Sequence, residues 1–106
     1  MVTINRIVHI HDVITGNAIG VEYDVAGGDL GGGSVSAGGN VISCNTEIDL
    51  AAFASTAITI SAANNFWDHL PPMRACTFAG DDICDFSTPA ATIDASGAAL
   101  AASPCP

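Results

Sequence analysis

The stretch from Asn40 to Ala63 constrains the fold most, because it contains two runs in which apolar and polar residues alternate. A period of two is typical of a β-strand with one buried face. In the longer run one face carries Ile42, Cys44, Thr46, Ile48 and Leu50, and the other carries Ser43, Asn45, Glu47 and Asp49. The shorter run sets Ile58 and Ile60 against Thr59 and Ser61. The centre of the chain therefore predicts core strands, with Cys44 on an apolar face where it could form a cross-link.

Strand patterns also flank this centre. Residues 2–14 and 19–25 alternate on either side of the turn sequence Thr15-Gly16-Asn17, which predicts an antiparallel hairpin. Residues 73–79 and 83–86 surround Gly80-Asp81-Asp82, a second hairpin signal. Short strands separated by turns, without a βαβ rhythm, predict an all-β fold, namely a small antiparallel β-sandwich or β-barrel.

The chain has 106 residues, which is enough for one domain. Residues 26–39 form a Gly-rich loop, whose backbone is entropically costly to order. Residues 87–106 are rich in Ala, Ser and Pro and contain one short strand candidate, at 91–95. We therefore expect a β domain over residues 1–86 and an extended C-terminal tail over 87–106, packed on the domain or on a neighbouring subunit.

The charge balance restricts the partners. The chain has eleven acidic and two basic residues, which gives a formal net charge of −9. Binding to nucleic acid and docking on an anionic membrane both need a basic face, so we expect neither. An acidic balance is typical of a soluble protein, and the alternative is that some carboxylates collect a divalent cation. Apolar residues make up 49% of the chain and charged residues only 12%, which predicts an apolar surface that is covered in an assembly. The first residues have no basic segment followed by an apolar run, so no cleavable signal peptide is expected.

Four cysteines in a small domain favour disulfides. They contain no Cys-x-x-Cys pair, which argues against a zinc knuckle or a thioredoxin-like site. Cys76 and Cys84 are equidistant from Gly80 in the predicted second hairpin, so we expect them to pair. Cys44–Cys105 follows by elimination and would fix the tail to the sheet. The alternative is a set of reduced, buried cysteines.

Two histidines are the first candidates for a metal site. His9 and His11 share one face of the first predicted strand, and this pair resembles the His-x-His strand motif of cupins. The resemblance implies a small metalloprotein. The Glu that cupins carry downstream is missing here, where Thr15 and Gly16 stand, and His69 is distant in sequence. We therefore interpret the pair as a polar strand face, and predict no metal or cofactor.

Acidic residues give two further candidates. Asp81, Asp82 and Asp85 have the composition of a calcium loop without the spacing of an EF-hand, so turn formation is the preferred interpretation. Asp68 and His69 could belong to a catalytic triad, but no Gly-x-Ser-x-Gly motif accompanies them. The sequence therefore predicts no catalytic residue, and the chain is not expected to be an enzyme.

Together these features favour a non-enzymatic structural assembly protein, such as a decoration or cement subunit of a virus capsid. Its partners would be further copies of itself or a larger lattice, such as a major capsid protein, and its location a virion or extracellular particle. The first alternative is a secreted or surface β-sandwich binding module, or a filament subunit. The second is a small metalloprotein of the cupin type.

Overall fold

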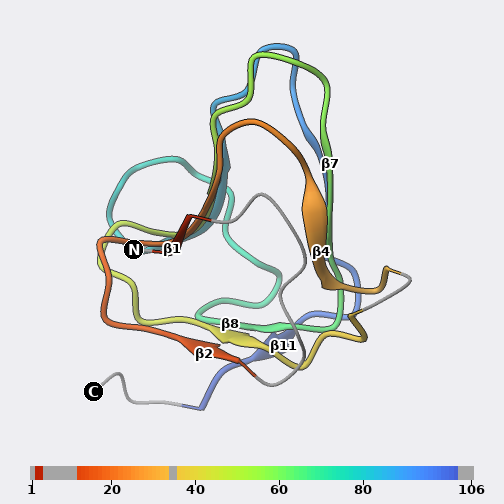
Figure 1. Ribbon diagram of the computed structural model, residues 1–106. Helices are drawn as coiled ribbons and strands as arrows, with labels where there is room; N and C mark the ends of the chain where they lie inside the picture. The colour runs from red at the N-terminus through yellow and green to blue at the C-terminus, as the bar shows by residue number, and fades with distance from the viewer. Residues whose placement is uncertain (1, 4–11, 34–35, 103–106) are drawn as a thin grey trace.

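The chain winds into a parallel β-solenoid with three sheets (Figure 1). The computed structural model describes residues 2–3, 12–33 and 36–102. Each complete coil contributes one strand to each sheet and takes roughly 30 residues, as in other solenoids. The first sheet has the strand order β1-β3-β6-β9, the second β4-β7-β10 and the third β2-β5-β8-β11. The strands are β1 (Val2–Thr3), β2 (Val13–Ile14), β3 (Ile19–Tyr23), β4 (Gly28–Gly31), β5 (Val41–Ile42), β6 (Ile48–Ala52), β7 (Thr59–Ala62), β8 (Phe66–Trp67), β9 (Asp81–Asp85), β10 (Thr92–Asp94) and β11 (Ala99–Leu100).

The all-β class is correct, but the predicted antiparallel sandwich or barrel is wrong. Every strand pair in the described part of the chain is parallel. The expected first hairpin does not form, because β2 belongs to the third sheet and β3 to the first. The expected second hairpin does not form either, since β9 pairs in parallel with β6. Alternation identifies a strand with one buried face, but it does not identify the partner strand, which here comes from the next coil and not from the neighbouring run.

The stretch from Asn40 to Ala63 contributes one strand to each of the three sheets. The long run expected as a single strand divides into β5 and β6, which belong to different sheets. Between them Cys44 has a φ of 57°, a left-handed conformation that turns the chain round the corner. The shorter run forms β7, close to its expected position.

The core consists of apolar side chains stacked from coil to coil. In the first sheet Val21, Leu50 and Ile83 occupy equivalent positions, and all are buried. Side chains from the other two sheets complete the same cluster, among them Leu30, Ile42, Ile60 and Trp67. Parallel coils with this repeated burial make each layer depend on its neighbours for its core.

Buried asparagines join successive coils at one corner. The N–H of Asn40 donates to Asn65 Oδ1 (3.0 Å), and the N–H of Asp12 donates to Asn40 Oδ1 (3.0 Å). Asn40 Nδ2 donates to the carbonyl oxygen of Leu30 (2.6 Å). These side chains provide the partners that buried backbone groups need where the strands end.

The described part of the Gly-rich segment makes close contacts within the chain. A Cβ at Gly27 would overlap the backbone of Thr59 in the next coil, so only glycine allows this close approach. The carboxylate of Asp29 accepts hydrogen bonds from the N–H groups of Gly31, Gly33 and Ser36, which hold the following loop. The segment therefore supplies β4 to the second sheet.

The C-terminal region also belongs to the solenoid. The strand expected at 91–95 is confirmed as β10, which pairs with β7, and β11 pairs with β8. Residues 87–102, expected as a tail on the domain or on a neighbour, thus supply two strands of the last coil, which we define as β9, β10 and β11.

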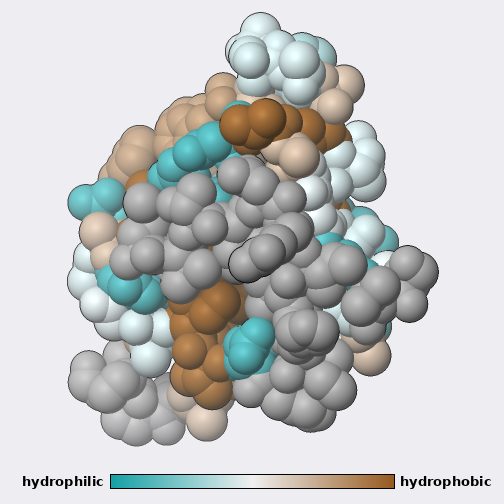
Figure 2. Space-filling model, in the orientation of Figure 1, coloured by the Kyte–Doolittle hydropathy of each residue, from teal (hydrophilic) through white to brown (hydrophobic). Residues whose placement is uncertain are grey.

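Part of the surface is apolar, as the composition suggested. Figure 2 shows a strongly hydrophobic area over β2, where Val13 is 67% exposed. Val25, after β3, is 69% exposed. The described residues contain no helix long and apolar enough to cross a bilayer.

Candidate functional site

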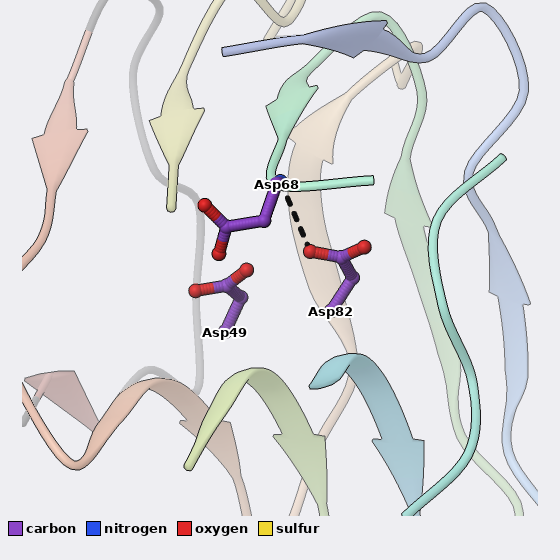
Figure 3. A group of neighbouring side chains, drawn as sticks. All are labelled: Asp49, Asp68 and Asp82. Atoms are coloured by element: carbon purple, nitrogen blue, oxygen red, sulfur yellow. Dashed lines mark hydrogen bonds between the residues drawn. The ribbon is translucent and has the colours of Figure 1, made fainter. Parts of the chain in front are cut away.

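Three aspartates converge at the corner between the third and first sheets (Figure 3). Asp49 lies on β6, and Asp82 occupies the equivalent position on the adjacent strand β9. Asp68 follows β8 directly, and Figure 3 shows its carboxyl group beside that of Asp49 and its backbone nitrogen bonded to Asp82. One carboxylate oxygen from each residue lies within 4.8 Å of the other two. We call this group the aspartate cluster.

Asp82 anchors the beginning of the long loop 68–80. It is fully buried, and its Oδ1 accepts the N–H of Asp68 (3.1 Å). Its Oδ2 accepts the N–H groups of His69 (3.2 Å) and Met73 (2.8 Å), and lies 2.9 Å from Nδ1 of the partly exposed His69 ring. The loop is therefore folded around this carboxylate.

Asp68 links the same loop to the preceding coil. Its carboxylate oxygens accept the N–H of Cys44 at 3.1 and 3.0 Å. The side chain is half-buried and lines an open depression of about 510 Å³, together with His69 and residues of the 44–46 and 79–80 segments. Solvent and small ions thus reach the cluster at Asp68.

Asp49 is the most enclosed member. It is fully buried, and its Oδ1 accepts a hydrogen bond from Asn45 Nδ2 (2.8 Å). Its Oδ2 is also buried and has no hydrogen-bond donor among the described residues. Burial, followed by the interaction with the Asp82 carboxyl group, raises the pKa of Asp49 to about 10. The charged form of Asp49 is therefore disfavoured in the isolated chain, and the neighbouring carboxyl groups are those of Asp68 and Asp82.

The aspartate cluster was missed by the sequence prediction, which placed Asp49 on the polar face of a strand. Asp82 was noticed only with Asp81 and Asp85, and those two do organise turns. The carboxylate of Asp81 accepts hydrogen bonds from the N–H groups of Thr77 and Phe78, and Asp85 accepts two from the turn that follows β9. The available signal was the repeat of Ile-Asp-Leu at 48–50 and Asp-Asp-Ile at 81–83, which fall in register on consecutive coils.

The expected histidine pair, His9 and His11, lies outside the described residues, and its interpretation as a polar strand face stays a prediction. His69 Nδ1 lies within hydrogen-bonding distance of the Asp82 carboxylate. In a catalytic triad built on Asp68 and His69, the carboxylate of Asp68 would orient the imidazole. Here the carboxylate that bonds the imidazole of His69 belongs to Asp82.

The predicted disulfide between Cys76 and Cys84 is present, with a Cα–Cα distance of 5.1 Å. The hairpin that motivated it is absent: Cys84 is on β9 and Cys76 is in the loop 68–80. The bond ties this loop to the first sheet. Cys44 is also disulfide-bonded. Its predicted partner, Cys105, lies outside the described residues, so the Cys44–Cys105 bond stays a prediction.

Comparisons with known proteins identify a family but not an activity. No curated protein and no solved structure matches the chain. Residues 2–74 match the model of a family described as protein of unknown function (DUF1565). Because the match spans more than half of the sequence, the chain belongs to the DUF1565 family.

Proposed function

We propose that the chain is a non-enzymatic structural module that joins a larger assembly by stacking through its last coil. One observation carries the proposal. In the third sheet Trp67 and Leu100 occupy equivalent positions on β8 and β11, and Ile42 and Ile14 precede them on β5 and β2. The exposed fraction along this column is 7% at Ile14, 0% at Ile42 and 0% at Trp67, but 55% at Leu100. Leu100 is thus a core position that lacks a following layer within the described residues.

The second sheet supports the same interpretation. Ile60 on β7 is fully buried, whereas its partner Ile93 on β10 is only partly buried. The strands β9, β10 and β11 are each last in the order of their sheet, and all belong to the last coil. Edge strands present backbone groups that can pair with another strand. A further layer would bury the apolar side chains and pair these edges at once.

The loop 68–80 covers part of the last coil and so reduces the area on which a further layer could stack. The carbonyl oxygen of Met73 accepts the N–H of Ile83 on β9 (3.0 Å), and Arg74 Nη2 donates to the carbonyl oxygen of Ile93 on β10 (3.2 Å). These contacts cover part of the first and second sheets at the last coil. The third sheet, where Leu100 is exposed, is therefore the part best suited to stacking.

The partner that fits this end is another layer of β-structure, and the simplest is a second copy of the chain. Two copies can meet end to end about a two-fold axis, which gives a closed, self-complementary contact. A lattice such as a virus capsid is the setting we favour, and a surface filament is the alternative. Both place the module in a virion or an extracellular particle.

A pair of neighbouring carboxylates can also catalyse glycoside hydrolysis. The separation and burial of the carboxylates in the aspartate cluster do not favour this reaction. Such enzymes place two carboxyl groups about 5–9.5 Å apart on either side of a substrate bond. Here the carboxylate oxygens lie within 4.8 Å of one another, and Asp49 and Asp82 are fully buried. Because Asp49 and Asp82 are fully buried, a sugar ring does not reach both carboxyl groups, and we propose no catalytic role.

The stacking proposal is tested by Leu100→Lys. We expect the wild-type chain to self-associate in sedimentation velocity experiments over a concentration series. The variant should weaken this association about tenfold or more, because one leucine burial corresponds to about 1.5–3 kcal/mol and a charge is added at the contact. The matched control is Val25→Lys, which also replaces an exposed apolar residue by lysine but lies after β3, outside the last coil. A wild-type chain that stays monomeric at every concentration, or equal effects of the two variants, would contradict the proposal.

A further inference from the structure

We propose that the aspartate cluster binds one divalent cation, with Ca²⁺ as the best match, through the carboxylates of Asp49, Asp68 and Asp82. This inference does not depend on the stacking proposal, because it concerns the corner between the third and first sheets. It departs from the expectation from sequence that the chain carries no metal site, an expectation that stays untested.

The spacing of the three carboxylates fits a single ion. Calcium is bound by oxygen ligands at about 2.3–2.6 Å, so two oxygens on one ion are at most about 5 Å apart. The oxygens of the cluster lie within 4.8 Å of one another. Figure 3 shows the three carboxyl groups turned toward a common centre, with Asp49 and Asp82 on adjacent strands and Asp68 opposite them.

The second observation is the buried Oδ2 atom of Asp49. It has no donor among the described residues, and the groups around it, Asp68 and Asp82, are themselves acidic. A buried carboxylate is costly unless a proton, a cation or hydrogen bonds compensate its charge. The half-exposed His69 contacts the cluster at Asp82, and its ring nitrogen does not reach Asp49 Oδ2 within hydrogen-bonding distance. An ion between the three residues would supply the missing partner.

The remaining ligand capacity and the access route are present. Asp82 Oδ1 accepts one backbone N–H, from Asp68, and a carboxylate oxygen can accept more than one interaction. Asp68 opens to the depression, so an ion can enter there and keep water ligands on that side. The donors are all oxygens, which suits hard cations, and Cys44 is not available as a thiolate because it is disulfide-bonded. Calcium tolerates irregular geometry, whereas Mg²⁺ requires a near-octahedral arrangement at a shorter distance.

Terbium luminescence and calorimetry test the site. The chain has a single tryptophan, Trp67, and it directly precedes Asp68, so Tb³⁺ bound at the cluster should show sensitised emission when the indole is excited. We expect one Tb³⁺ per chain and competition by Ca²⁺. Calorimetric titration of the wild-type chain with Ca²⁺ should show one saturable site.

Asp49→Asn is the decisive variant, because an amide keeps the shape and hydrogen bonding of the neutral acid but loses the anionic ligand. We expect Ca²⁺ affinity to fall at least tenfold. The control is Asp24→Asn, which removes the same charge at the residue after β3 and should leave binding unchanged. Absence of saturable Ca²⁺ binding by the folded wild-type chain would overturn the proposal. Equal weakening by the two variants would also overturn it, because Ca²⁺ affinity would then depend only on the net charge of the chain.

Discussion

Trp67→Ala should lower the free energy of unfolding by about 3–5 kcal/mol, which is the usual cost of deleting a fully buried large aromatic side chain. Trp67 is completely buried in the core cluster and lies in the column between Ile42 and Leu100. Its indole N–H has no hydrogen-bond partner among the described residues, so the expected loss comes from the cavity and not from a broken hydrogen bond. A chain of this size typically has about 5–15 kcal/mol of stability, so the variant should be largely destabilised.

Urea unfolding followed by far-ultraviolet circular dichroism measures this effect, because the variant has no tryptophan fluorescence. Phe66→Ala is the matched control: Phe66 precedes Trp67 on β8, alternates to the other side and is 37% exposed. Its loss should cost about 1 kcal/mol or less. Similar losses for the two variants would contradict the assignment of Trp67 to the interior column.

Gly27→Ala should destabilise the chain by on the order of 3 kcal/mol, as overpacking at a rigid backbone contact does. A Cβ at this position would overlap the carbonyl group of Thr59 at the start of β7. Thr59 cannot move freely, because it pairs with Thr92 on β10 while β7 also pairs with β4. The added methyl group must therefore displace the second sheet.

Gly16→Ala separates this steric effect from backbone strain. Gly16 has a φ of 77°, but a Cβ there would meet no atom within 4 Å. Only the conformational penalty of about 1–2 kcal/mol is expected. The two variants are compared by chemical unfolding under the same conditions, and a larger loss for Gly16→Ala than for Gly27→Ala would rule out the close coil-to-coil approach at Thr59.

The fold could be predicted from the sequence only as far as its class. Alternation around Ile48 and Leu50 correctly indicated strands, but it contains no information on which strand lies beside them. The repeat that defines the solenoid is weak, because equivalent positions share burial and not identity: Ile19, Ile48 and Asp81 stand in the same column. Without that repeat, the turn signals favoured local hairpins, which are the commoner connection between neighbouring strands.

The candidate site was hidden for a related reason. Asp49 lies on the polar side of its strand, a position that usually faces solvent. Asp82 and Asp68 enclose it only because β9 stacks beside β6 and the chain turns back at the corner after β8. Burial of that carboxylate therefore depends on contacts between coils that the sequence pattern does not report. The Cys76–Cys84 bond was predictable, because the two residues are close in sequence and their pairing does not require a hairpin.

The corner between the third and first sheets differs in length from coil to coil, which has a consequence for how such a protein can evolve. The short version, at 43–47, and the long version, at 68–80, join strands that stack in the same register. Residues can therefore be inserted at this corner without displacing the layers on either side. The longer version contains Asp68, the Cys76 side of the disulfide and the segment that lies against β9 and β10. Descendants of one scaffold can thus acquire different ligands by insertion at a single corner, while the layers beneath stay unaltered.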